Sequence, residues 1–238
     1  MALSVKFLRV GLTALALTGA AAVVQAEDAA PIDLHPAKAA PRPPIRPNAP
    51  TADPASISAA EAIRRANNYL NSLQVMSADF VQMGPDGKRS EGKLYLQRPG
   101  RMRFQYAPPE RLDIVADGRS LAVRDQKLGT QDLYFIGQTP LKFLLADHVD
   151  IAHDTQIQNI SSDPNAVAIT IFDKATFGGS ATITLMFDPT TFALKQWTVL
   201  DSQGLQTVVT LFNVDLSATP DASLFKIDER QQMMNSRR

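Results

Sequence analysis

Apolar and polar residues alternate with a period of two along most of the chain after residue 77. The alternation runs through segments 78–80, 93–97, 102–106, 112–116, 120–124 and 133–135, and again through 167–171, 183–187, 194–198 and 208–212. Turn signals such as Asp86-Gly87 and Asp117-Gly118 separate these segments. A spacing of about ten residues per strand is typical of an antiparallel meander, either open or closed into a barrel.

Two of these strands meet at Arg98-Pro99-Gly100, where proline and glycine turn the chain. Leu94, Leu96 and Arg98 share one face of the first strand, so the last inward position of an apolar row is a guanidinium. This placement predicts an apolar surface with a polar latch at its rim. The alternative is an ordinary rim arginine paired with a surface carboxylate.

The same period assigns faces to three other strands. Met102 and Phe104 face inward with Leu94 and Leu96. Arg101 and Arg103 face outward, where they either form a docking surface for an acidic partner or are ordinary solvated residues. In the later strands the period places Trp197 on the face opposite Leu194 and groups Val208, Thr210 and Phe212 on one face.

A helix is predicted before the first strand. Ser58-Ala-Ala-Glu61 has the spacing of a capping box, in which serine and glutamate satisfy two free amide donors. The apolar positions that follow are spaced by three and four residues, at Ile63, Ala66, Leu70 and Leu73. The pattern predicts one amphipathic helix from Ala59 to Leu73.

A second, shorter helix is predicted between the two series of strands, over Gly137 to Ala146. Thr139 suits the N-cap and Pro140 the first helical position, and Leu141, Leu144 and Leu145 are its apolar residues. Isolated helices below about 12 residues are marginal in water, so this one must lie on an apolar surface. A short helix that interrupts a sheet is well placed to act as a lid.

The N-terminus indicates secretion. Lys6 and Arg9 precede an uncharged apolar run, and small residues lead up to Ala26, so we expect a signal peptide over residues 1–26 that is cleaved after Ala26. The run is shorter than the roughly 20 residues that span a bilayer. The chain contains no cysteine, which excludes disulfides, thiol catalysis and cysteine-based zinc sites.

Residues 27–56 read as a Pro-rich linker, and residues 57–238 as one domain. Eight of the sixteen prolines fall in a stretch that has almost no large apolar residue: Pro31, Pro36, Pro41, Pro43, Pro44, Pro47, Pro50 and Pro54. Such a segment cannot pack a core and is either a passive spacer or an arm that docks a partner. The last segment that reads as a strand is Leu224–Ile227.

Composition and motifs argue against several classes of function. Without the signal peptide the basic residues fall from 24 to 22, against 24 acidic ones, so nothing draws the protein to nucleic acid. His148 and His153 stand among aspartates, but their spacing does not join the two imidazoles on one helix face, and we expect no metal site and no cofactor. Nucleophile-elbow, zincin and phosphate-loop motifs are missing, so we expect no enzymatic activity.

The order of several short motifs resembles the LolA family of periplasmic carriers of outer-membrane lipoproteins. The motifs are Ala78-Asp-Phe-Val-Gln82, Glu91-Gly-Lys-Leu-Tyr-Leu-Gln-Arg-Pro99, Phe104-Gln-Tyr106, Val115-Ala-Asp-Gly118 and Thr139-Pro-Leu-Lys-Phe-Leu-Leu145. The resemblance spans roughly Ile57 to Asp228. It implies a mainly-β α+β fold, in which an open antiparallel half-barrel carries an N-terminal helix and short lid helices over an apolar cavity.

The resemblance also implies roles for residues and partners. The family's lid-holding arginine falls on Arg98, and its acyl-chain positions fall on Met102, Phe104, Leu141 and Leu144, beside the strand positions Leu94 and Leu96. The implied cargo is acylated lipoproteins, taken from the inner-membrane ABC transporter LolCDE and passed to an acceptor similar to LolB. We expect a monomer that works in the periplasm.

Two other functions stay open from the sequence. A periplasmic lipid-binding or envelope-stress-sensing module could use the same fold, and would hold a lipid without releasing lipoproteins from membranes. An enzyme acting on an apolar ester would depend on His148 or His153.

Overall fold

The computed structural model describes residues 57–176 and 179–227. The predicted signal peptide, the predicted Pro-rich linker and the tail from residue 228 lie outside the described residues. Among the described helices, none has the length and apolar character needed to cross a bilayer.

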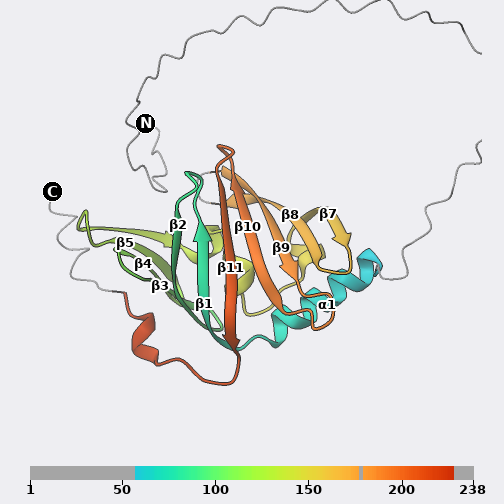
Figure 1. The fold of residues 1–238 in the computed structure, drawn as a ribbon, viewed down its shortest axis with the longest axis horizontal. Helices are drawn as coiled ribbons and strands as arrows, with labels where there is room; N and C mark the ends of the chain where they lie inside the picture. The colour runs from blue at the N-terminus through green and yellow to red at the C-terminus, as the bar shows by residue number, and fades with distance from the viewer. Residues whose placement is uncertain (1–56, 177–178, 228–238) are drawn as a thin grey trace, which may run out of the picture. The chain divides into compact units, whose positions relative to one another are not determined.

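Eleven antiparallel strands form one sheet (Figure 1). Their bounds are β1 Val75–Met83, β2 Arg89–Gln97, β3 Arg101–Tyr106, β4 Leu112–Asp117, β5 Ser120–Asp125, β6 Thr130–Phe135, β7 Gln156–Ser162, β8 Val167–Thr176, β9 Gly179–Phe187, β10 Leu194–Asp201 and β11 Gln206–Asp215. Their order is β6-β5-β4-β3-β2-β1-β11-β10-β9-β8-β7, so β1 pairs with β11 in the middle and β6 and β7 are the two edges. The prediction of a mainly-β fold with an open antiparallel sheet is confirmed.

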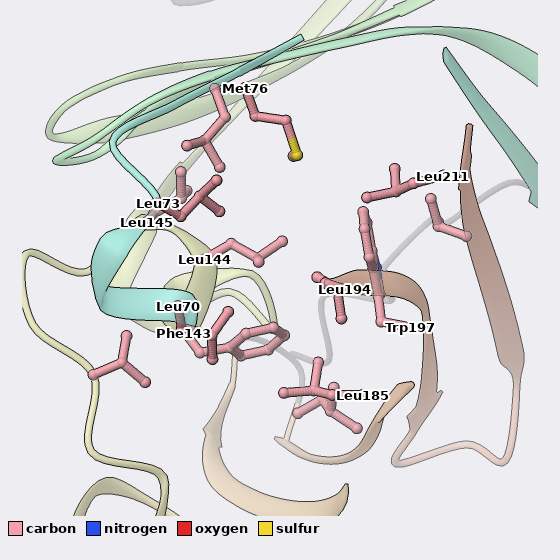
Figure 2. Packing of buried hydrophobic residues seen from close by; sticks show 14 of the residues in the cluster. Leu70, Leu73, Met76, Phe143, Leu144, Leu145, Leu185, Leu194, Trp197 and Leu211 are labelled. Carbon is pink, nitrogen blue, oxygen red and sulfur yellow. The ribbon is translucent and has the colours of Figure 1, made fainter. Parts of the chain in front are cut away.

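Within the described residues, one helix of 14 residues and several helical segments of three or four residues lie outside the sheet. They are α1 Ala59–Ser72 before β1, the 3₁₀ helix η1 Ile136–Gln138, α2 Lys142–Leu145 and α3 Ile151–Asp154 between β6 and β7, and the 3₁₀ helix η2 Ala222–Phe225 after β11. Buried side chains of α1 and α2 join those of the sheet in one apolar cluster (Figure 2). We call α1, α2 and α3 the helical cover, and the sheet face beneath them the inner face.

Helix α1 ends within one residue of its predicted limit, but its contacts differ in two details. The Ser58 hydroxyl accepts the Glu61 amide at 3.2 Å, whereas the Glu61 carboxylate binds Arg64, so only half of the capping box forms. Ala62 is fully buried and Ile63 only partly. The small alanine lets the helix approach the sheet closely, and the larger isoleucine lies at the flank.

Register shifts at two places in the sheet interrupt the alternation of inward and outward side chains. A register shift between Leu194 and Gln196 turns Leu194 and Trp197 to the same side, so the prediction that they face opposite sides was wrong. A second shift between Ile157 and Asn159 lies in β7, a strand that the sequence did not predict. Its two isoleucines are three residues apart, which hides the alternation.

Strand β11 buries the face opposite to the one that carries Val208, Thr210 and Phe212, and the sequence analysis did not decide between the two faces. Val209 and Leu211 are buried, whereas Phe212 is 48% exposed. Both faces of this strand carry large apolar residues, Val208 and Phe212 on one and Val209 and Leu211 on the other, so alternation alone could not decide which side meets the core.

Three short segments outside the sheet also differ from prediction. The Thr139 hydroxyl donates to the Ile136 carbonyl at 2.8 Å and closes η1, so α2 begins at Lys142 instead of Pro140. Residues 151–154 form α3, a helix that the sequence analysis did not predict. The expected strand Leu224–Ile227 instead contains the end of η2, whose Phe225 is buried.

Aromatic packing on the inner face generates a stability prediction. Phe104 is 3% exposed, and its ring meets Phe80 edge-on at 5.0 Å and Trp197 at 6.2 Å between centroids. Phe104→Ala should lower the free energy of unfolding in urea by about 3–5 kcal/mol. Phe135→Ala, at a side chain that is 71% exposed, is the matched control and should change it by less than about 0.5 kcal/mol. A loss below about 1 kcal/mol for Phe104→Ala would contradict a tightly packed inner face.

Candidate functional site

The inner face carries adjacent apolar pairs beside the turn at Arg98. Leu94 lies opposite Phe104, and Leu96 lies opposite Met102, across the β2–β3 ladder. All four side chains are buried. They form one continuous apolar surface that the helical cover hides from solvent.

The helical cover contributes its own apolar side chains to this interior. Leu144 is fully buried, Phe143 is buried although the sequence did not single it out, and Leu141 is half-buried. Figure 2 shows Phe143 and Leu144 turned toward the strand residues Leu194 and Trp197. The predicted acyl-binding residues are therefore brought together, with Leu141 at their margin.

Arg98 joins the sheet to the helical cover. Its Nε donates to the Ala146 carbonyl at 2.7 Å, its Nη2 donates to the same oxygen, and its Nη1 donates to the Leu70 carbonyl. Leu70 lies in the last turn of α1, and Ala146 is the C-cap of α2. One side chain of β2's inward row thus holds two helices at once.

Physical chemistry explains why a guanidinium fits here. The last carbonyls of a helix have no intrahelical partner and carry partial negative charge. The last turn of α1 contains no basic residue of its own, so Arg98 supplies the cation from the sheet. Burial lowers the pKa of Arg98 from its usual value, and the nearby Asp147 carboxylate opposes that shift. An arginine stays protonated in such a site, which a lysine does less reliably.

Backbone contacts of the same turn and two asparagines complete the attachment. The Gly100 amide donates to the Leu145 carbonyl at 2.8 Å. The Asn71 side chain donates to the Val149 carbonyl at 2.8 Å and accepts the Val149 amide at 2.9 Å, and Asn67 accepts the Ile151 amide at 3.1 Å. These bonds tie α1 to the segment before α3, so the helices are joined to each other as well as to the sheet.

Sequence reasoning missed Asn67 and Asn71, although a signal was present. Asparagine is a poor helix former, because its side chain competes for backbone groups. Two asparagines four residues apart on a helix share one face and can bind a neighbouring chain. A second missed contact is an ion pair at the start of α2, in which Lys142 Nζ lies 2.7 Å from Asp173 Oδ2 of β8.

The two predicted docking arginines have different surroundings. Arg101 is exposed, whereas Arg103 makes two 3.0 Å bonds to the Asp113 carboxylate and donates to the Leu224 carbonyl at 3.3 Å. Arg103 therefore anchors η2 to the outer face of the sheet, where Phe225 is buried. The docking hypothesis stays a prediction for Arg101.

Two grooves on the surface of the described residues are lined by residues other than the predicted acyl-binding ones. The larger, of about 580 Å³, lies between the end of α1 and strands β10 and β11, with Tyr69, Lys195 and Phe212 in its wall. His148 and His153 are exposed, and within the described ranges no group of three or more potential metal ligands surrounds them.

The geometry is suited to binding an apolar molecule after a movement. The inner face is large and apolar, but the helical cover buries it. A ligand could reach it only if the cover separates from the sheet, which requires the bonds of Arg98 and Gly100 to break. The arrangement is therefore an apolar interior that the helical cover closes, with polar bonds at its rim.

Comparison with known proteins gives consistent matches. The family model described as outer membrane lipoprotein carrier protein LolA matches residues 71–228. An outer-membrane lipoprotein carrier protein of Legionella pneumophila (strain Corby) is 30% identical over 168 residues, which are 66% of this chain and 80% of that protein. An uncharacterised protein of Rickettsia prowazekii is 29% identical over 109 residues, which are 46% of this chain and about half (51%) of that protein.

Solved structures also match this chain, at low sequence identity. The crystal structure of a LolA superfamily protein from Nitrosomonas europaea has a TM-score of 0.41 and 11% sequence identity, and the match covers 72% of this chain and 99% of that one.

The Arg103–Asp113 pair generates a prediction with a defined pH dependence. Burial raises the pKa of Asp113 above its usual value, while Arg103 opposes the shift. Arg103→Leu removes that opposition, so the folded-state pKa of Asp113 should rise further. A carboxyl whose pKa is raised by folding stabilises the fold at low pH and loses that contribution as pH rises through the folded-state value.

The variant should therefore be less stable than the parent by about 1–3 kcal/mol at pH 7, and the difference should shrink toward pH 4. Urea unfolding at both pH values measures it. The exposed Arg101→Leu serves as the control and should show no such dependence. A loss of stability in Arg103→Leu that becomes larger as pH falls would contradict the role assigned to the Arg103–Asp113 pair.

Proposed function

Because this chain belongs to the LolA family of outer membrane lipoprotein carrier proteins, we propose that it is a periplasmic carrier that binds the acyl chains of lipoproteins and delivers them to the outer membrane. The observation that carries the proposal is the bridge from Arg98 to the carbonyls of Leu70 and Ala146. This bridge holds the helical cover closed over the apolar inner face. A carrier between two membranes needs such an apolar surface and a cover that hides it from water.

Energetics favour a carrier without a cofactor or a catalytic group. Burial of an acyl chain contributes about 0.8 kcal/mol per methylene, so the two or three chains of a lipoprotein would cost tens of kcal/mol if released into water. A carrier must bury them, yet it must let them go at the acceptor. The polar bonds that favour the closed, empty state supply that bias, because they are lost whenever cargo holds the cover open.

We place the protein in a relay across the periplasm. A signal peptide over residues 1–26, cleaved after Ala26, would bring it there, and residues 27–56 would form the linker before the carrier domain. The inner-membrane transporter LolCDE would load it, and an acceptor similar to LolB would unload it. Loading then draws its energy from the transporter, and we propose that the carrier itself is monomeric and not an enzyme.

The proposal is tested by adding the purified mature protein to spheroplasts of its source bacterium and collecting the supernatant. Triacylated lipoproteins that co-elute with the protein, and that vanish when the transporter's ATPase is disabled, are the expected result. Failure to release them, in a folded protein that still binds an acyl probe, would reject the carrier function and favour a lipid-binding or envelope-stress-sensing module.

Arg98→Leu generates the sharpest functional prediction. The variant should fold, because it removes a bridge and no core volume, but its cover should open more easily. Hydrogen bonds to a charged group contribute about 1.5–3 kcal/mol, so cargo should be retained more tightly by about tenfold to a hundredfold. Transfer to acceptor membranes should slow by a corresponding factor. The measurement mixes loaded carrier with outer-membrane vesicles and follows the lipoprotein that sediments with the vesicles.

Arg119→Leu is the matched control, since Arg119 is exposed and lies outside the predicted latch and docking positions. It should load and transfer like the parent protein. Normal transfer by Arg98→Leu, at unchanged stability, would dismiss Arg98 as a latch.

A further inference from the structure

The inward row of β8 ends in a charged residue, as the inward row of β2 does. Val167, Ile169 and Ile171 are buried at every second position, and the next inward position is Asp173, which is 7% exposed. The inward row of β2 continues one residue beyond Gln97, the last residue of the strand, to Arg98, which is 8% exposed. The two strands lie in opposite halves of the sheet, on either side of the central β1–β11 pair.

Asp173 and Arg98, the last residues of these two inward rows, both bind the same short helix. Asp173 Oδ2 lies 2.7 Å from the ammonium of Lys142, the first residue of α2. Arg98 binds the carbonyl of Ala146, the residue that follows the last one of α2. A helix of four residues has almost no stability of its own, so its position depends on these attachments and on its buried side chains.

We propose that the Lys142–Asp173 ion pair is a second clasp of the helical cover, which fastens α2 to the β8 half of the sheet while Arg98 fastens it to the β2 half. Opening of the interior then requires both attachments to break, and Asp173 is a positioning residue that acts through Lys142. The inference rests on the proposed function for its biological meaning, but the clasp itself concerns only how the cover opens.

The two attachments should respond differently to salt. Lys142 is 26% exposed at its side chain, so dissolved ions reach one partner of the Lys142–Asp173 pair and screen its attraction. Arg98 binds uncharged carbonyls, whose attraction to a guanidinium is short in range. The second clasp is therefore the part of the cover that ionic strength can loosen.

Hydrogen exchange without any cargo tests the clasp directly. The reporters are the Gly100 amide, which donates to the Leu145 carbonyl, and the Ala146 amide, which donates to the Lys142 carbonyl at 2.7 Å. Lys142→Gln and Asp173→Asn should each raise exchange at these amides by about threefold to tenfold, and the double variant should add little to either. Lys142→Arg keeps the charge and should restore protection.

A matched control is present on the outer face of the same sheet. Lys93 Nζ also lies 2.7 Å from a carboxylate oxygen, that of Asp79, but this pair does not contact the cover. Lys93→Gln should leave exchange at Gly100 and Ala146 unchanged. Raising salt from about 0.05 M to 1 M should accelerate exchange at both amides in the parent protein and not in Lys142→Gln.

The outcomes separate the clasp from the carrier function. If hydrogen exchange at the two amides in Lys142→Gln equals that of the parent protein, the clasp is overturned and the carrier proposal stays intact. This variant remains informative even where Asp173→Asn fails to fold. Faster exchange in Lys142→Gln, with no release of lipoproteins by the parent protein, would retain the clasp and reject the carrier. Equal salt acceleration in the parent and Lys142→Gln would also overturn the clasp.

Discussion

The structure depends on a guanidinium that is buried among backbone carbonyls. Arg98 lies at the end of an apolar row of β2 and binds carbonyl oxygens at the C-terminal ends of α1 and α2. Such oxygens attract a cation because the helix leaves them without partners. The consequence is a cover of short helices that is fixed over the sheet by directional polar bonds, in addition to its apolar contacts. A cover fixed in this way can separate as a unit.

The fold balances two ways of burying the same surface. In the closed state the helices bury the inner face, and in a loaded state acyl chains would do so. The sheet provides a common frame, because each strand pairs with its neighbours all the way from β6 to β7. In the proposed carrier the polar bonds at the rim would be lost when the cover opens, so they would favour release without weakening the contacts of the interior with an apolar chain. An acceptor then needs only to offer the chains a comparable apolar site.

Much of this arrangement could be predicted from the sequence, and the failures have physical causes. The helix at 59–72, the sheet and the inward position of Arg98 follow from periodicity and capping. The side on which Trp197 lies could not, because a bulge between Leu194 and Gln196 shifts the period by one residue.

Long-range contacts were equally hidden from the sequence. Nothing in a strand or in a short helix says that Lys142 and Asp173 will meet, since their contact depends on how two halves of the sheet curve toward one helix. The pairing of Asn71 with Val149 is hidden for the same reason, although asparagines inside a helix did signal a partner.

The most direct test of this account uses the chain's only tryptophan. Trp197 is 2% exposed and faces the interior beside Phe104, so it reports contact with anything that enters there. Stearic acid brominated along its chain, titrated into the mature protein, should quench Trp197 fluorescence at the same concentrations at which the lipid binds. Binding of the brominated chain without quenching would place the ligand outside the interior and contradict the account.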